Sequence, residues 1–121
     1  MAEPNPEELF NLGMLSYDKQ DFSKARKYFE RACDLNISGG CGALGDLYDD
    51  GKGVEKNLIK AAYFYSKACE LKESDGCGAL GALYYNNGDG VKQDSKKAVA
   101  LFEKACKLGY KKACEMLKEL R

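Results

Sequence analysis

Six cysteines are the residues of this chain whose type and spacing most clearly predict chemistry. An even and dense cysteine count in a short chain favours disulfide formation in an oxidising compartment. Zinc binding and redox exchange are less favoured because the chain has no C-x-x-C motif. Buried free thiols remain the alternative that spacing alone leaves open. The cysteines form three pairs, each eight positions apart: Cys33 and Cys41, Cys69 and Cys77, and Cys106 and Cys114.

A second pattern that could have a catalytic role is Ser16-Tyr17-Asp18-Lys19, which matches the S-x-x-K motif of serine nucleophiles. With six serines and 16 lysines among 121 residues, chance predicts ~0.8 such matches. The partner motifs S-D-N and K-T-G are absent, and the chain has no histidine to act as a base. Ser16 and Lys19 are therefore catalytic candidates on this motif alone. The sequence leaves enzymatic activity open, and we expect neither a metal nor a cofactor.

Composition narrows the class of protein further. Hydrophobic residues make up 45% of the 121 residues and charged residues 31%, which is typical of one globular domain. The 19 basic and 19 acidic residues balance, so we expect no nucleic-acid partner. No apolar run approaches the roughly 20 residues of a membrane span, so none is expected.

An internal repeat sets the positions of the cysteines, because the pairs recur after 36 and 37 residues. Each first cysteine follows an aromatic residue by four positions and an alanine by eight, which is the spacing of one helix face. Asn5, Asp21, Asn57 and Asp94 are predicted N-caps. Gly51 to Val54 and Gly88 to Val91 are predicted turns. We expect helices at 6–18, 22–35, 39–50, 57–72, 75–87, 95–108 and 110–120.

These motifs resemble known helical repeats. The spacing of Leu12, Gly13 and Phe29 is similar to a tetratricopeptide repeat, whereas A-L-G-x-L-Y followed by G-x-G-V, seen at 43–54 and 79–91, resembles Sel1-like repeats. The eight-spaced cysteine pairs resemble the Helicobacter cysteine-rich protein family. The resemblance implies an all-α fold, an α/α right-handed superhelix (solenoid). Its predicted parts, within a single domain at 1–121, are a TPR-like repeat at 6–36, Sel1-like repeats at 37–72 and 73–108, and a capping helix at 109–121.

The expected helix hairpins select one disulfide pairing from the 15 that six cysteines allow. The first cysteine of each pair closes one helix and the second opens the next, so a tight turn brings their Cα atoms to the ~5.5 Å that a disulfide needs. We therefore expect Cys33–Cys41, Cys69–Cys77 and Cys106–Cys114. The bridges predict a secreted or periplasmic protein, whose signal peptide is not part of this sequence.

The first helices of the repeats should line the concave face of such a solenoid. Phe10 and Asp75 are expected there, and the predicted binding residues are Met14, Tyr17, Asp18, Asp46, Asp49, Asp50, Tyr85 and Asn86. This wall would be acidic with aromatic steps, and would suit a basic or amine-bearing extended partner. The alternative is that these carboxylates form only a solvated helix face.

Two functions from different classes follow. The first is a disulfide-stapled scaffold that binds a peptide, a cell-wall fragment or a host protein through its concave face, acting as a monomer. The second is implied by the family resemblance alone: a penicillin-binding protein with weak β-lactamase activity, for which a β-lactam or a peptidoglycan-derived peptide would be the ligand.

Overall fold

A computed structural model describes residues 4–86 and 90–120, and in this part of the chain it contains seven α-helices and no strand. The all-α prediction is therefore confirmed, and the helix ends lie within two residues of the expected ones. The last residue of the predicted helix 75–87 and the predicted turn residues Gly88 and Asp89 lie outside the described residues. The helices are α1 (Pro6–Asp18), α2 (Phe22–Asp34), α3 (Ser38–Asp50), α4 (Leu58–Glu70), α5 (Ser74–Asn86), α6 (Ser95–Lys107) and α7 (Lys111–Leu120).

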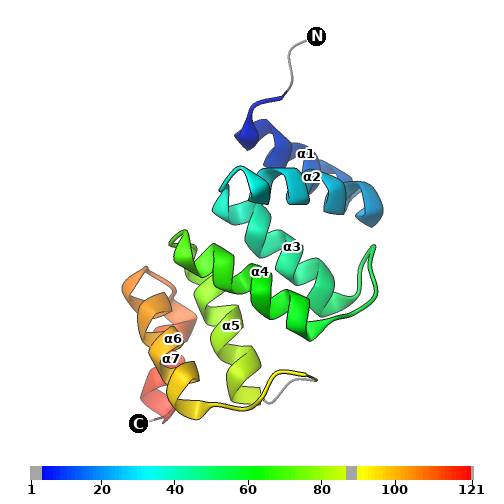
Figure 1. Cartoon of the computed structure of the whole chain (residues 1–121). Coiled ribbons are helices and arrows are strands. Elements are labelled where there is room, and N and C mark those ends of the chain that lie inside the picture. Colours follow the sequence, from blue (N-terminus) through cyan, green and yellow to red (C-terminus); the bar gives the residue numbers. More distant parts are fainter. Residues whose placement is uncertain (1–3, 87–89, 121) are drawn as a thin grey trace.

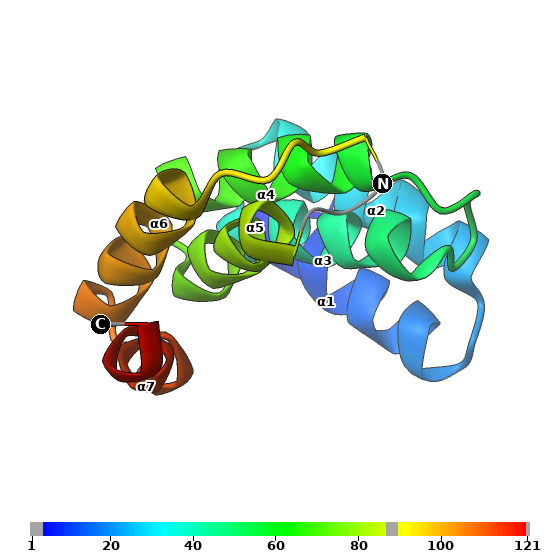
Figure 2. The same cartoon turned by 90° about the horizontal axis from the view of Figure 1, so that it is seen from below.

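The helices stack in the order of the sequence, which confirms the expected solenoid (Figure 1). The helix contacts run between neighbours along the chain, from α1 with α2 to α6 with α7, with a minor contact between α1 and α3. Seen from below, the second helices α2, α4 and α6 lie along one side of an arc, and α1, α3, α5 and α7 lie along the other (Figure 2). None of the helices in the described residues has the length and apolar character needed to cross a bilayer.

Side-chain caps fix where the helices begin. The Asn5 side chain accepts a hydrogen bond from the Glu8 amide at 2.9 Å, and Pro6 follows at the first helical position. The side chains of Asp21, Asn57 and Asp94 accept from the amide three residues further on, at 3.2, 3.0 and 3.0 Å. All four predicted N-caps are confirmed.

Small residues let each first helix approach the aromatic residue of its own second helix. Phe29, Tyr65 and Phe102 are buried at equivalent positions of the three repeats. Glycine faces each ring, and a Cβ added to Gly45 would lie 2.6 Å from the Tyr65 ring. The glycines therefore cost helix propensity in exchange for close helix packing.

The three predicted disulfides are present, and each joins a second helix to the first helix that follows it. The Cα separations are 4.6 Å for Cys33–Cys41, 4.6 Å for Cys69–Cys77 and 4.8 Å for Cys106–Cys114. All six cysteines belong to the described residues and none is free, which excludes the alternative of buried thiols. Each closed loop of nine residues contributes about 2.5 kcal/mol in the chain-entropy model.

The turns that carry the disulfides share one backbone feature. Asn36, Lys72 and Gly109 follow the three second helices and have positive φ angles of 64°, 67° and 102°. A glycine there is free of the steric cost that a side chain meets in this region. The turn is therefore the same in three repeats although only one of them has glycine.

The glycine packing predicts opposite effects for two neighbouring substitutions in α3. Gly45→Ala should lower the free energy of unfolding by about 1–3 kcal/mol, because the new methyl group displaces the Tyr65 ring. Gly42→Ala is the matched control, since a Cβ there meets only Ala68 Cβ at 3.9 Å. It should raise the free energy of unfolding by up to about 1 kcal/mol through helix propensity. Urea titrations of both variants measure the difference, and equal effects would contradict the packing argument.

Candidate functional site

A groove of about 270 Å³ is lined mainly by residues of the first helices α1, α3 and α5. Figure 2 shows these helices together along the concave side of the arc. We call this groove the concave groove. Apolar side chains of α1 form one wall, small residues of α3 form the floor, and acidic side chains surround it. Its lining residues are Phe10, Met14, Gly39, Gly42, Ala43, Asp46, Tyr65, Glu73, Asp75 and Gly76.

Tyr65 belongs both to the buried core and to the lining of the groove. Its ring is only 2% exposed, and its hydroxyl donates to Asp46 Oδ1 at 2.6 Å, with Asp49 Oδ2 at 3.1 Å. Because one hydroxyl carries one hydrogen, the two carboxylates compete for it. Repeats one and three have Phe29 and Phe102 at this position. The tyrosine hydroxyl therefore supplies a polar anchor that the other repeats lack.

The groove has a negative electrostatic character. Burial raises the pKa of Asp46 above its ordinary value of 3.8, although the hydrogen bond from Tyr65 lowers it. The charges of Asp50, Asp49 and Asp75 raise it further. Burial and the hydrogen bond to Asp46 likewise raise the pKa of Tyr65, so its hydroxyl stays a donor. A cation entering the groove would relieve this repulsion.

A second hydrogen bond fixes an acidic side chain at the edge of the groove. Ser38 Oγ donates to Glu73 Oε2 at 2.8 Å, from the first residue of α3 to the residue before α5. This bond links the start of α3 to the turn that carries the Cys69–Cys77 bridge. The hydrogen bond therefore keeps the Glu73 carboxylate at the lining of the groove.

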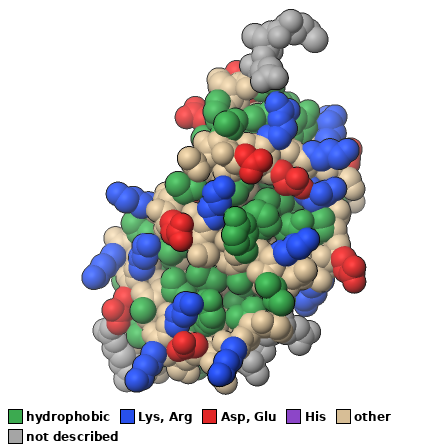
Figure 3. All heavy atoms as spheres, in the orientation of Figure 1, with side chains coloured by type: hydrophobic (Ala, Val, Ile, Leu, Met, Phe, Trp, Pro, Cys, Tyr) green, Lys and Arg blue, Asp and Glu red, His purple; other side chains and the backbone are tan. Residues whose placement is uncertain are grey.

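The opposite face of the molecule differs in character. Figure 3 shows apolar side chains between the helices of this face, with lysines and arginines spread among them. Ile59 and Tyr63 of α4 are exposed, at equivalent positions to Ser23 and Lys27 of α2. The groove lining is thus acidic, whereas the face in Figure 3 carries lysines and arginines together with aspartates and glutamates.

The structure brings together some of the predicted binding residues and separates others. Met14 and Asp46 line the concave groove, together with Phe10 and Asp75, and Asp49 lies behind it at the Tyr65 hydroxyl. The others lie outside the groove lining: Tyr17, Asp18 and Asp50 toward the ends of α1 and α3, and Tyr85 and Asn86 at the end of α5.

Lys52 contacts Tyr17, one of the predicted binding residues that lie outside the groove lining. Lys52 Nζ donates to the Tyr17 hydroxyl at 3.0 Å and lies 5.2 and 5.3 Å from the ring centroids of Tyr17 and Phe22. The hydrogen bond to Tyr17 raises the pKa of Lys52, and the charge of Asp50 adds to this. Tyr85 instead packs half-buried against the cluster around Phe102.

Sequence reasoning missed Tyr65 and Glu73 as groove residues. Tyr65 is the aromatic residue four positions before Cys69, and a tyrosine among phenylalanines at one repeat position is a signal for a polar contact. Glu73 lies between Cys69 and Cys77, in the turn that the disulfide closes. The spacing of residues along the sequence does not indicate that this side chain reaches the groove.

Ser16 and Lys19 line a small hollow of about 140 Å³ that is separate from the concave groove. Ser16 is buried, and its hydroxyl donates to the Leu12 carbonyl of its own helix at 2.9 Å. That hydrogen bond is the ordinary back-bonding of a helical serine and does not activate a nucleophile. Among the described residues, no cluster of three or more potential ligands could hold a metal ion.

Comparisons with known proteins agree with the geometry. The profile of the Sel1 repeat matches residues 40–73 and 74–110, and that of the tetratricopeptide repeat matches residues 6–38. The solved structure of Helicobacter pylori cysteine rich protein B is similar with a TM-score of 0.74 and 48% identity, covering 82% of this chain and 71% of that one.

Two curated relatives from Helicobacter pylori are similar over half of this chain. HcpC is 60% identical over 60 residues, which are 50% of this chain and 21% of HcpC. Beta-lactamase HcpA is 52% identical over 60 residues, which are 50% of this chain and 24% of HcpA. The matched stretch thus spans about a quarter of these relatives or less.

The raised pKa of Asp46 predicts a pH-dependent difference in stability. Because the folded state holds this proton more tightly than the unfolded state, the contribution is present below pH 3.8 and is lost as the pH rises through the folded pKa. Asp46→Asn removes this loss and keeps an acceptor for Tyr65. The stability of the variant relative to the natural protein should therefore increase between about pH 3 and about pH 7. Urea unfolding at each pH measures it, and a constant or decreasing difference would contradict the assignment.

Proposed function

Because this chain belongs to the Sel1 repeat family, with relatives among the Helicobacter cysteine-rich proteins, we propose that it is a binding scaffold whose concave groove takes an extended peptide carrying a basic side chain. The chain is a disulfide-rich repeat protein, and such proteins present a long curved surface for protein contacts. The observation that carries the proposal is the combination of an apolar wall with an acidic edge in one groove.

The lining of the groove matches the chemistry of lysine or of a similar amine. Phe10 and Met14 offer apolar surface for an aliphatic stem, and the carboxylates of Asp46 and Asp75 lie where the cationic end would reach. Glycine and alanine on the floor let a peptide backbone approach closely. A basic protein segment is the partner we favour. An amine-bearing cell-wall fragment and a host protein with such a segment share this chemistry.

Preorganisation supports the same proposal. Tyr65 holds the Asp46 carboxylate from below, and Ser38 holds Glu73 at the edge. The Cys33–Cys41 bridge fixes α3 against α2, and Cys69–Cys77 fixes α5 against α4. A site whose side chains and helices are already ordered loses less entropy when a ligand binds.

The proposed compartment is extracytoplasmic. Three disulfides in one small domain are stable in an oxidising environment and are rare in reducing cytosol. Secretion or periplasmic residence therefore forms part of the proposed function.

A weak β-lactam hydrolase is the second candidate, and the name of the relative HcpA is the observation that favours it. Ser16 argues against a serine mechanism, because its hydroxyl hydrogen is engaged by Leu12 and its position is at the C-terminal part of α1. Binding of a β-lactam as an analogue of a cell-wall peptide fits the scaffold better than turnover does.

Peptide binding tests the favoured function. A fluorescent alanine-rich peptide with one central lysine should bind the oxidised protein, and acetylation of that lysine should weaken binding about tenfold. The double variant Asp46→Asn, Asp75→Asn should weaken binding by a similar factor in fluorescence anisotropy. Glu55→Gln, on an exposed loop, is the matched control and should bind like the natural protein. Equal binding of the acetylated and free peptides would exclude the cation site.

Kinetics on a chromogenic cephalosporin tests the second function. Any turnover by the natural protein should persist unchanged in Ser16→Ala and in Lys19→Ala, because neither side chain is placed as an activated nucleophile or base. A loss of turnover by more than about a hundredfold in either correctly folded variant would instead establish the serine mechanism.

A further inference from the structure

The junction of α2 and α3 contains the tripeptide Asn36-Ile37-Ser38, which the proposed binding function does not use. It matches N-x-S, the pattern at which an oligosaccharide is attached to asparagine in secreted proteins. The chain has six asparagines, six serines and no threonine, and this tripeptide is its only match. Because chance predicts ~0.3 matches at this composition, the place of Asn36 in the fold decides whether it can serve as a glycan site.

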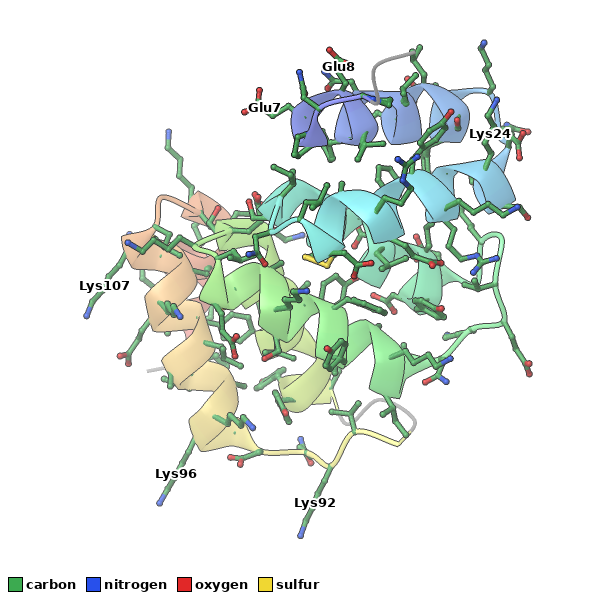
Figure 4. The ribbon with its side chains drawn as sticks, turned by 45° about the horizontal axis from the view of Figure 1, so that its top comes forward. Glu7, Glu8, Lys24, Lys92, Lys96 and Lys107 are labelled. Carbon is green, nitrogen blue, oxygen red and sulfur yellow. A yellow bond between two sulfur atoms is a disulfide. The ribbon has the colours of Figure 1, made fainter. Side chains whose placement is uncertain are left out.

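Asn36 lies at the surface of a tight turn. It is exposed and has a φ angle of 64°, in the left-handed region that asparagine adopts more readily than most residues do. Figure 1 shows the turns after α2, α4 and α6 along the same edge of the solenoid. Lys107, beside the turn after α6, points away from the rest of the molecule (Figure 4). This edge of the molecule is therefore open to solvent.

An inner repeat exposes the same turn position. Lys72 is the equivalent residue after α4, with a φ angle of 67°, and it is exposed. That turn has repeat one before it and repeat three after it, and neither covers it. The accessibility of Asn36 therefore follows from the geometry of the repeat and does not depend on what precedes α1 or follows α7.

The fold uses the main chain of Asn36 and leaves its side chain available. The backbone N–H of Asn36 donates to the Cys33 carbonyl at 2.9 Å and closes the turn. The side chains of Asn5 and Asn57 accept hydrogen bonds at helix starts, whereas the Asn36 side chain has no hydrogen bond among the described residues. Asn36 is also outside the lining of the concave groove. A glycan on Asn36 and a peptide in the groove therefore use different side chains.

We propose that Asn36 carries an N-linked glycan, added in the extracytoplasmic compartment that is part of the proposed function and on which this inference rests. The co-substrate is an oligosaccharide joined to a polyprenyl diphosphate. The side-chain nitrogen of Asn36 attacks the anomeric carbon of the sugar and forms a C–N bond, while the C–O bond to the diphosphate breaks and the lipid diphosphate leaves with its electron pair. The nitrogen loses one proton to a base of the transferase, so no oxidant or reductant takes part. The product is bulky and hydrophilic, which suits an exposed turn.

The folded turn implies an order of events. A transferase that recognises the tripeptide contacts the Asn36 amide and the Ser38 hydroxyl together, yet in the fold the Ser38 hydroxyl donates to Glu73 Oε2 at 2.8 Å. Ser38 is also the first residue of α3, and the Cys33–Cys41 bridge closes the loop around the tripeptide. The transfer therefore precedes the formation of this bridge. The folded protein then holds the glycan without rearrangement, since Asn36 is exposed.

Mass spectrometry of the protein from the extracytoplasmic fraction of its native cells tests the site. The peptide that contains Asn36 should carry the mass of an oligosaccharide, and Asn36→Gln should remove that mass. Ser38→Ala should lower the occupancy of Asn36 by at least about tenfold, whereas Ser38→Thr should keep it within about twofold, because a hydroxyl at this position is part of the pattern. Unmodified Asn36 throughout the mature protein, or an occupancy that Ser38→Ala leaves unchanged, would overturn the proposal.

Repeat two provides a matched gain of the site. Lys72-Glu73-Ser74 lies in the equivalent bridged turn, with the serine present and a lysine in place of the asparagine. Asp34 and Glu70 stand two positions before Asn36 and Lys72, so the two stretches also match there. Lys72→Asn should therefore add a second glycan, and Lys72→Gln should add none. Circular dichroism verifies that both variants are folded. A single glycan in Lys72→Asn would contradict the inference that the pattern and the turn together define the site.

The order of events and the binding function are tested separately. When protein without glycan is mixed with native-cell membranes that hold the transferase and its donor, the reduced chain should accept glycan at least about tenfold faster than the oxidised protein, because the folded turn exposes the tripeptide only by local unfolding. An equal or faster reaction of the oxidised protein would overturn this order. Asn36→Gln should bind the lysine-bearing peptide like the natural protein, because Asn36 is outside the groove lining. Peptide binding without any glycan therefore refutes only this inference, and a glycan without peptide binding refutes only the binding function.

Discussion

The disulfide at the turn between consecutive repeats is the constraint on which the remaining structure depends. Four small clusters of buried residues form the interior of the described chain, and cysteines belong to two of them. A domain of this size buries a limited apolar area, so covalent links are a common addition. Each bridge joins the second helix of one repeat to the next first helix. The links therefore reinforce the interfaces between repeats, which contribute to the stability of a solenoid together with the repeats themselves.

The groove is a result of this spacing. With α3 and α5 held against the second helices that precede them, the first helices leave a hollow that small residues keep open. Gly45 lets the Tyr65 ring approach, and the ring carries its hydroxyl to Asp46 and Asp49. The Tyr65 side chain therefore serves both the packing of its ring in the core and the hydrogen bonding of the acidic residues at the surface. Changes at either place are expected to affect both.

Much of the fold could be predicted because its causes are local. Alanine and aromatic residues at helical spacing gave the helix faces, and Asn5, Asp21, Asn57 and Asp94 marked helix starts through contacts three residues away. The disulfide pairing followed from the expected hairpins. The site could be predicted only in part, since it depends on contacts between distant residues. Lys52 binds the Tyr17 hydroxyl from 35 positions away, and Ser38 reaches Glu73 over the same separation. No spacing within one helix predicts such pairs.

The bridges are not equally shielded from solvent. The sulfur-bearing residues of the first two pairs are buried, whereas Cys106 and Cys114 are only partly so. Thiol–disulfide exchange requires an attacking thiolate to reach a sulfur in line with the bond. A small reductant would therefore open the last bridge first and loosen α7, uncovering Phe102 while the first two repeats stay linked. Among the three bridges, the one between α6 and α7 is therefore expected to respond first when the surroundings lose oxidising power.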